Sequence, residues 1–297
     1  MTQTAPTRAG MVALVGRPNV GKSTLVNALV GEKVSIVTPK PQTTRHRIIG
    51  VLTEPGLQIA LVDTPGLHTG QRSALNRVLN ETAMASLSGI DVVLFMIEAG
   101  FWRDEDVAAL ARLEKLQMPV GLVVNKIDRM PDKDELLPFI QSVCERREFA
   151  FVAPISARKS RNLKAVIDEC ASRMPEGPFL FPEDEYTDRT LRFIAAETVR
   201  EKLTMFLQQE LPYSAAVEIE SFENGEEQIE IHACIWVSRE NHKAIVIGKG
   251  GLMLKKIGRA ARLDLVERMD QRVDLRLWVK VRENWIDSEA SVRDLGH

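Results

Sequence analysis

Cysteine is scarce in the sequence and long apolar runs are missing, and both features narrow the class of protein. Only three of the 297 residues are cysteines, Cys144, Cys170 and Cys234, and they form no C-x-x-C pattern. We therefore expect buried thiols in a reducing compartment, with no disulfide framework and no zinc site. No apolar run reaches the ~20 residues of a membrane span. The first ten residues contain no hydrophobic signal core, so no export is expected.

An excess of charge of one sign is also missing. The formal net charge is −2, so the whole chain carries no nucleic-acid signature and any basic surface must be local. The five histidines form no i, i+4 pair that could hold a metal on a helix. With 44% hydrophobic and 27% charged residues, the composition is typical of a globular protein. The length predicts two domains.

A glycine motif near the start of the chain lies between an apolar run and a helical pattern. Met11–Val15 has the length of a buried strand, Gly16–Ser23 reads G-x-x-x-x-G-K-S, and Thr24–Val30 has helical spacing. This context is typical of a phosphate-binding loop, in which free N–H groups and the helix dipole favour an anion. Lys22 would reach the β- and γ-phosphates, and the Ser23 hydroxyl would bind Mg²⁺. An ordinary glycine turn is the alternative.

The segment that follows is suited to sensing a nucleotide. Residues 34–53 begin as a polar loop with two prolines and then enter a strand. A threonine in such a loop senses the γ-phosphate and Mg²⁺ in nucleotide switches, and Thr43 and Thr44 are both candidates. A surface loop rich in threonine is the alternative, and spacing alone does not decide between the two.

A second predicted strand, Leu57–Val62, ends in the sequence D-T-P-G at residues 63–66. An acid at the end of a strand beside a phosphate loop suits the outer shell of Mg²⁺, which is the role we predict for Asp63. Gly66 can turn its N–H toward a γ-phosphate, because glycine tolerates unusual backbone angles.

Two later strands end in residues suited to recognising a base. Val120–Val124 leads into N-K-I-D at residues 125–128, and Ala150–Ile155 leads into Ser156-Ala157-Arg158. Asp128 can accept hydrogen bonds from N1–H and the 2-amino group of guanine, a pair that adenine does not offer. A backbone N–H of the second segment could hold the guanine O6. A plain strand-to-helix turn is the alternative for each segment taken alone.

Strands and helices alternate through this half, which predicts an α/β fold with a mostly parallel sheet and helices on both faces. The motifs all lie at carboxyl ends of strands, where ligands bind in such sheets. The remaining elements expected are helices at Ser73–Leu87, Asp104–Leu116 and Asn162–Ser172 and a strand at Ile90–Ile97.

Five motifs of this half, taken in order, resemble the five guanine-nucleotide boxes of the translation-factor-related GTPases. They are G-R-P-N-V-G-K-S, Q-T-T-R-H, D-T-P-G-L, N-K-I-D and S-A-R. The resemblance implies catalytic roles for Lys22, Thr44 and Gly66 and metal binding by Ser23, Thr44 and Asp63. It implies nucleotide contacts by Gly16, Arg17, Pro18, Asn19, Val20, Gly21, Lys22, Ser23, Thr24, Asp63, Thr64, Pro65, Gly66, Asn125, Lys126, Asp128, Ser156, Ala157 and Arg158. Leu67 stands where Ras-like proteins carry the glutamine that orients water, and leucine cannot do so. Slow hydrolysis is therefore expected.

Asn19 raises the question of a second cation. In GTPases with a similar G-R-P-N-x-G-K-S loop, the matching asparagine helps to bind K⁺ beside the phosphates. That resemblance makes K⁺ a candidate cofactor here. The alternative is that Asn19 only shapes the loop.

The second half differs in pattern. Residues 174–187 contain three prolines and an acidic run, which predict an extended linker. Beyond it the expected order is α-β-β-α-α-β, with helices at Leu191–Leu211, Asn241–Ile247 and Leu252–Met269 and strands at Ala215–Phe222, Gln228–Val237 and Val273–Val281. Leu254, Ile257, Ala261 and Leu265 are expected to face the core. Trp285 is expected to pack rather than to bind a base.

The break I-G-K-G-G between two helices resembles the G-x-x-G loop of a KH RNA-binding domain, which clamps single-stranded backbone. The segment 239–262 holds seven basic residues and one acid. The RNA-binding residues that we expect are Gly248, Lys249, Gly250, Gly251, Lys255, Arg259 and Arg262, the last three on one helix face. A solvated basic helix face is the alternative.

A GTPase half joined to a KH half resembles the bacterial ribosome-assembly GTPases. The boundaries that we expect are a tail at 1–9, a GTPase domain at 10–173, a linker at 174–187, a smaller α+β KH domain at 188–284 and a tail at 285–297. The resemblance implies GTP/GDP and Mg²⁺ binding, contact with 16S rRNA near its 3′ end, and assistance to 30S assembly. It also implies a monomer in the cytoplasm with peripheral association at the inner membrane.

Two other functions remain open from the residues alone. One is an RNA-binding scaffold with a structural nucleotide domain, against which the complete set of Lys22, Ser23, Asp63 and Asp128 argues. The other is a P-loop kinase that uses ATP, against which N-K-I-D argues.

Overall fold

The structure is a computed structural model that describes residues 6–41, 43–66, 74–208 and 211–295. The chain forms two compact units. The first comprises residues 1–35, 44–70 and 79–188, and the second comprises residues 36–43, 71–78 and 189–297. Within the described residues, no helix is both long and apolar enough to cross a membrane.

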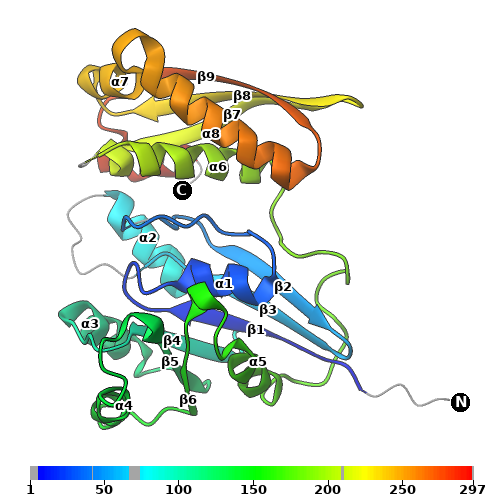
Figure 1. Ribbon diagram of the computed structural model, residues 1–297, viewed down its shortest axis with the longest axis vertical. Coiled ribbons are helices and arrows are strands. Elements are labelled where there is room, and N and C mark those ends of the chain that lie inside the picture. Colours follow the sequence, from blue (N-terminus) through cyan, green and yellow to red (C-terminus); the bar gives the residue numbers. More distant parts are fainter. Residues whose placement is uncertain (1–5, 42, 67–73, 209–210, 296–297) are drawn as a thin grey trace, which may run out of the picture. The chain divides into compact units, whose positions relative to one another are not determined.

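The first unit is built on a six-stranded sheet in the order β2-β3-β1-β4-β5-β6 (Figure 1). Its strands are β1 (Arg8–Val15), β2 (Ile48–Glu54), β3 (Leu57–Asp63), β4 (Val92–Glu98), β5 (Val120–Asn125) and β6 (Phe151–Pro154). Only β2 runs antiparallel to its neighbour, and the other pairs are parallel. The prediction of a mostly parallel sheet is confirmed.

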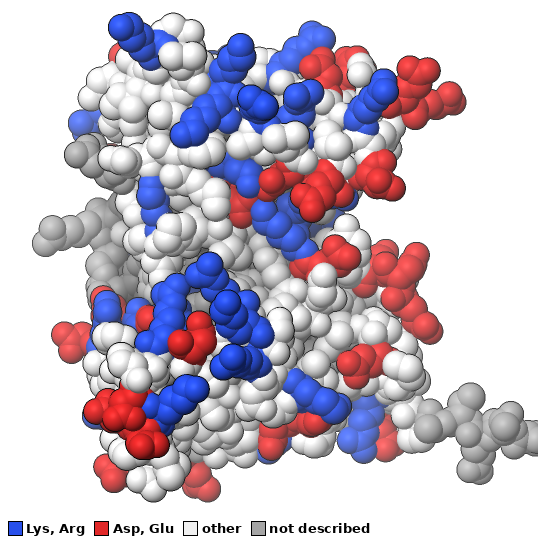
Figure 2. All heavy atoms as spheres, viewed as in Figure 1, with Lys and Arg blue, Asp and Glu red and all other residues white. Residues whose placement is uncertain are grey.

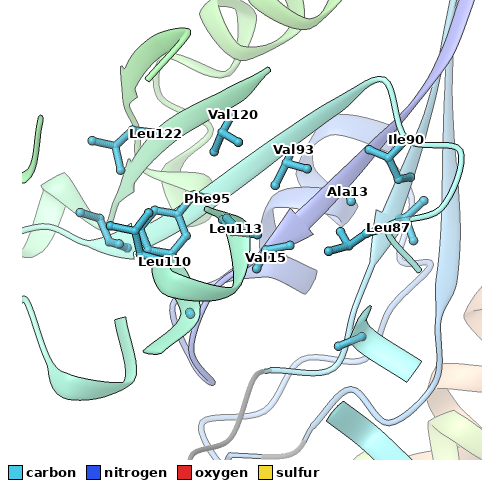
Figure 3. Close-up of a cluster of buried hydrophobic side chains, with 14 of the residues drawn as sticks. Ala13, Val15, Leu87, Ile90, Val93, Phe95, Leu110, Leu113, Val120 and Leu122 are labelled. Atoms are coloured by element: carbon cyan, nitrogen blue, oxygen red, sulfur yellow. The ribbon is translucent and has the colours of Figure 1, made fainter. Parts of the chain in front are cut away.

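Alternation along the strands divides the apolar side chains between two faces. Ala13 and Val15 of β1 join a cluster on one face, while Val12 and Leu14 join a cluster on the other. Figure 3 shows the first cluster, in which Phe95 of β4 lies among side chains from neighbouring strands and from α3. The two-faced arrangement follows from the period of two in a strand that is buried on both sides.

Four helices belong wholly to this unit: α1 (Lys22–Val30), α3 (Asp104–Leu113), α4 (Leu136–Cys144) and α5 (Leu163–Ala171). A further helix, α2 (Ala74–Ala85), belongs to this unit only from residue 79 onward. Side chains of α3 and α4 join the cluster of Figure 3, and those of α1 and α5 join the other cluster. Helices therefore cover both faces, as predicted. The sequence reading did not identify α4.

The predicted linker is attached to the first unit along much of its length. The Gln58 side chain donates to the Phe181 carbonyl at 2.9 Å and accepts from the Leu180 N–H at 2.8 Å. The Val51 N–H donates to the Tyr186 carbonyl at 3.0 Å. The expected linker is therefore bonded to the sheet at several points, and a turn interrupts it where the Glu185 N–H donates to the Pro182 carbonyl at 3.1 Å.

The second unit contains a three-stranded sheet in the order β7-β8-β9. Its elements are α6 (Leu191–Phe206), β7 (Ala215–Asn224), β8 (Gln228–Val237), α7 (Glu240–Ile247), α8 (Leu252–Met269) and β9 (Arg272–Val281). β8 pairs antiparallel with β7 and parallel with β9. The expected order α-β-β-α-α-β is confirmed.

At the two ends of this unit, one prediction is wrong and one is confirmed. Helix α6 ends at Phe206 rather than at Leu211, because the next residue, Leu207, adopts an extended backbone with φ −87° and ψ 156°. Trp285 is fully buried and its Nε1 donates to the Ser214 carbonyl at 3.0 Å, so the prediction that it packs is confirmed. A short helix, α9 (Glu289–Asp294), follows it.

Candidate functional site: a nucleotide pocket and a nucleic-acid groove

The phosphate loop lies between β1 and α1, and two of its glycines are required by close contacts. A Cβ at Gly16 would lie 2.4 Å from the Met96 carbonyl oxygen. Gly21 has φ +106°, and a Cβ there would lie 2.3 Å from Asn125 Nδ2. Both positions therefore demand glycine on steric grounds, which is how the backbone can curl around an anion.

Lys22, at the start of α1, bonds to the loop itself. Its Nζ donates to the Gly16 carbonyl at 3.0 Å and to the Arg17 carbonyl at 3.1 Å. Burial lowers the pKa of Lys22 to about 8, although the negative charge of Asp63 opposes this shift. A bound phosphate would supply the compensating charge that the free site lacks.

The lowered pKa of Lys22 predicts how nucleotide affinity depends on pH. Phosphates favour charged Lys22, so the pKa rises on binding and GDP binding takes up a proton above pH 8. The affinity for GDP should be flat from pH 6.5 to 7.5 and should fall toward pH 9, by up to about tenfold per pH unit.

Calorimetry in buffers of different ionisation enthalpy measures the proton uptake directly. Uptake should be absent at pH 7 and substantial at pH 8.8. The variant Lys22→Met is the control, because it cannot titrate and should bind GDP weakly with no proton uptake at either pH. Wild-type binding without uptake at pH 8.8 would contradict the assignment.

Three oxygen donors predicted to bind metal converge beside Lys22. Ser23 Oγ lies 2.8 Å from Thr44 Oγ1, and Thr44 Oγ1 lies 3.4 Å from Asp63 Oδ2. Asp63 Oδ1 is buried and has no hydrogen-bond partner among the described residues. Burial raises the pKa of Asp63, against the effects of the Ser23 hydroxyl and the Lys22 charge. Hydroxyl and carboxylate oxygens are what Mg²⁺ prefers, so the donor set fits that ion.

The choice between the two threonines is decided by their hydrogen bonds. Thr43 Oγ1 donates to the Lys40 carbonyl at 2.7 Å and lies 2.7 Å from Thr38 Oγ1. Its hydroxyl is thus used within its own loop, whereas that of Thr44 faces Ser23 and Asp63. Thr44 is therefore the metal and γ-phosphate candidate.

The D-T-P-G segment, which begins at the last residue of β3, also contacts the phosphate loop. A Cβ at Gly66 would lie 2.9 Å from the backbone nitrogen of Pro18. Glycine is therefore required at residue 66 by close approach, a reason that the sequence reading did not foresee. The Thr64 hydroxyl donates to the Leu14 carbonyl at 2.7 Å and stabilises the end of β3. Leu67 lies outside the described residues.

The base-recognition residues are bonded to one another and to the phosphate loop. Asn125 Nδ2 donates to the Val20 carbonyl at 2.8 Å, and its Oδ1 accepts from the Ala157 N–H at 3.0 Å. Asp128 Oδ1 accepts from Ser156 Oγ at 2.6 Å. This hydrogen bond is the main reason that the pKa of Asp128 is lowered, so the carboxylate is an acceptor at neutral pH.

Two of the predicted contact residues, Val20 and Arg17, cannot offer their side chains to a nucleotide. Val20 is fully buried, so its contribution would come from the backbone. Arg17 is turned into ion pairs with Glu98 and Asp106, both at 3.1 Å. Arg17 is therefore no arginine finger. Pro18, Asn19 and Arg158 lie on the loops named above, and Arg158 is exposed.

In the second unit, the G-x-x-G loop connects α7 with α8. Gly248, Gly250 and Gly251 have φ values of +72°, +59° and +78°, a region that other residues rarely adopt. Lys249 is exposed. The loop therefore presents backbone and one cation to solvent with little steric cover.

A groove of about 450 Å³ starts at this loop and runs along α8. Its lining combines apolar and basic side chains, namely Leu254, Leu275 and Leu277 with Lys255, Arg259 and Arg262, together with Gly251 and Gly258. In Figure 2 the Lys and Arg spheres gather over the part of the molecule where α7 and α8 lie. An apolar floor with a basic rim suits single-stranded nucleic acid.

The groove refines one expectation and adds residues that the sequence reading missed. Leu254 packs against the core cluster of this unit, as expected, but it is only partly buried and its remaining surface lines the groove. Gly258 was missed, and a Cβ there would lie 3.3 Å from Leu277 Cδ1. A glycine in the interior of α8 is the signal that could have revealed a site of close approach.

Comparison with known proteins supports both candidate sites, the nucleotide pocket and the nucleic-acid groove. Residues 11–126 match the family model described as 50S ribosome-binding GTPase, and residues 210–286 match the KH domain model. The chain is 52% identical to GTPase Era of Stenotrophomonas maltophilia (strain K279a) and to GTPase Era of Xanthomonas campestris pv. campestris (strain B100), with 100% of each chain covered.

Two solved structures are also similar over nearly the whole chain. One is Era in complex with MgGDPNP and nucleotides 1506–1542 of 16S ribosomal RNA, and the other is an Aquifex aeolicus Era variant bound to GDP and AlF4⁻. For each, the TM-score is 0.94 and the identity 42%, covering 98% of this chain and 99% of the other.

Proposed function

Because the chain belongs to the GTPase Era family, we propose that it is a GTP-hydrolysing switch that binds 16S rRNA near its 3′ end and assists assembly of the 30S subunit. The observation that carries this proposal is the joining of the three nucleotide motifs into one site. Asn125 bonds both to the phosphate loop, at Val20, and to the S-A-R segment, at Ala157. A site that recognises guanine and phosphates together suits GTP.

The first unit would use its residues in separate roles. Mg²⁺ would be held by Ser23 and Thr44, with Asp63 in its outer shell, and would neutralise charge on the phosphates. Lys22 would bind the β- and γ-phosphates once they replace the carbonyls that it contacts. The chain offers no glutamine at residue 67 to orient water, and Arg17 is held in ion pairs. We therefore propose slow intrinsic hydrolysis.

The second unit would hold RNA through the G-x-x-G loop and the groove along α8. The loop glycines, which carry no side chain, allow close approach of the phosphate backbone, and the Lys255, Arg259 and Arg262 side chains supply positive charge. Leu254, Leu275 and Leu277 give bases an apolar surface. The known structure of Era with a 16S rRNA fragment supports this choice of ligand.

Two binding measurements test the proposed function. Equilibrium binding should show GTP and GDP far tighter than ATP. An oligonucleotide with the sequence of the 16S rRNA 3′ end should bind more tightly than its complement. Both oligonucleotides are measured in the presence of MgGTP and in the presence of MgGDP. Equal binding of ATP would favour a kinase, and RNA binding without any nucleotide binding would favour a scaffold.

We also propose that K⁺ accelerates hydrolysis through Asn19 and loop carbonyls. Asn19 has φ +63° within the phosphate loop, so its backbone is specialised there. GTP turnover should be faster in KCl than in NaCl at equal ionic strength, by about tenfold, because a cation beside the phosphates stabilises developing charge. Asn19→Ala should lose the difference. Equal wild-type rates in both salts would leave Asn19 a loop-shaping role only.

The place of action is proposed as the cytoplasm, where 30S assembly would provide the RNA. A monomer that also associates peripherally with the inner membrane is the form we propose. Cell fractionation tests it: the protein should be mainly soluble, and high salt should release any membrane-bound part.

A further inference from the structure

Glu98 ends β4, the strand between β1 and β5, so it lies between the phosphate loop and the base-recognition motif. Its Oε2 accepts from Arg17 Nη2 at 3.1 Å and from Lys126 Nζ at 2.9 Å. Only 16% of the Glu98 side chain is exposed, and 7% of the Arg17 side chain. One carboxylate oxygen therefore joins two loops that are more than a hundred residues apart in the sequence.

Arg17 also forms an ion pair with a second carboxylate. Its Nε donates to Asp106 Oδ2 at 3.1 Å, and the same oxygen accepts from the Arg103 N–H at 3.0 Å. The cations Arg17 and Lys126 thus pair with the carboxylates of Glu98 and Asp106. Asp106 is fully buried and lies in the first turn of α3. Removing Arg17 would leave the buried Asp106 carboxylate unpaired, whereas removing Glu98 would leave Arg17 paired with Asp106 but no longer joined to Lys126.

Lys126, the second cation bound by Glu98, belongs to the base-recognition motif. Lys126 has φ +66°, an uncommon conformation for lysine, and Asp128 follows two residues later. Burial by itself would raise the pKa of Glu98, but Lys126 and Arg17 outweigh it and hold that pKa below its usual value. The bridge is therefore ionic near neutral pH.

We propose that Glu98 is a positioning residue that couples guanine recognition to phosphate binding. It touches neither base nor phosphate in this scheme. It acts through Lys126, whose placement sets Asp128, and through Arg17, whose placement sets the phosphate loop. The inference rests on the proposed function, namely that the first unit binds guanine nucleotides.

A coupling role and a purely stabilising role predict different binding data. If Glu98 positions Asp128, its loss weakens the hydrogen bond to the 2-amino group of guanine. GDP carries that group and IDP does not, so GDP should lose more affinity than IDP. If Glu98 only stabilises the fold, both ligands should lose affinity by the same factor.

The experiment measures dissociation constants of GDP and IDP for the wild type and Glu98→Gln, with the full chain. Couplings between sites usually change affinity by about 5- to 150-fold. We expect GDP to bind about 30-fold more weakly and IDP about fivefold more weakly, so the GDP/IDP preference falls about sixfold. Thermal unfolding of the free protein reports whether the variant is folded.

Two further variants keep the test decisive. Glu98→Asp retains the charge, so it should fold even if the glutamine variant does not, but its shorter side chain cannot reach both cations. It should also lower the GDP/IDP preference. Glu169→Gln removes an acid of a more exposed ion pair, with Arg173, and should change neither constant.

The outcomes separate the inference from the proposed function. A GDP/IDP preference equal to that of the wild type in a folded Glu98 variant would overturn the inference. Wild-type protein that binds neither GDP nor IDP would instead overturn the proposed function.

Discussion

Replacing Asp128 with asparagine should change the preferred nucleotide from GTP to XTP. Asparagine offers one acceptor and one donor where aspartate offers two acceptors, which suits the N1–H and C2 carbonyl of xanthine rather than the amino group of guanine. Sites that pair a ligand with buried hydrogen bonds discriminate by about 10⁴- to 10⁵-fold. We expect the GTP/XTP preference to fall by at least about 10³-fold.

The structure indicates that this substitution can keep the hydrogen bond that holds the side chain of residue 128. Ser156 Oγ donates to Asp128 Oδ1, and an asparagine oxygen can accept the same bond. Competition of XTP and GTP for a fluorescent GDP analogue measures the preference. The control is Asp132→Asn, an exposed acid four residues away, which should leave the GTP/XTP preference as in the wild type. An Asp128→Asn protein that still prefers GTP would disprove the role of Asp128.

Placing aspartates at Lys249 and Gly250 should abolish most RNA binding without unfolding the second unit. A Cβ at Gly250 meets nothing within 4 Å, and aspartate is among the residues that tolerate its left-handed backbone. Gly248 would be a poor choice, because a Cβ there would lie 2.7 Å from Met253 Cβ. The pair of changes brings negative charge to the RNA phosphates, and affinity should fall by about 10²-fold.

Filter binding of the 3′-end 16S rRNA oligonucleotide across a salt series measures this effect. The wild-type affinity should fall with salt, with a slope of about 0.7 per neutralised phosphate. Aspartates at Lys164 and Gly56 are the matched control, because Lys164 is 83% exposed and a Cβ at Gly56, with φ +77°, meets nothing within 4 Å. Undiminished RNA binding by the Lys249 and Gly250 variant would contradict the KH assignment, and GDP affinity should be unaffected by either pair.

The order of elements and the motifs at strand ends could be predicted because they depend on local pattern. Continuous apolar runs such as Val120–Val124 indicate strands buried on both faces, and that run is part of β5. In β8 the alternate residues Ile229, Ile231, Ala233, Ile235 and Val237 are buried, and Cys234 on the opposite side is also fully buried. Boundaries were less accurate, as in α6, because the end of a helix depends on partners beyond it.

The roles of individual side chains within the predicted site were harder to read. Thr43 and Thr44 are adjacent and chemically alike, and only the hydrogen bonds to Lys40 and Ser23 distinguish them. Leu254 fits the apolar stripe of α8 and packs against the core, and only the structure shows that it also lines the groove.

By itself, the sequence determined the two domains, the phosphate loop, the base-recognition motif and the G-x-x-G loop, since each follows from residues close together in the chain. The tertiary structure decided which partners those residues have. Arg17 meets Asp106, which is 89 positions away, and Glu98 joins Arg17 to Lys126. No spacing rule connects such residues. They meet because parallel strands bring their carboxyl ends to one edge of the sheet, where buried charges must find one another.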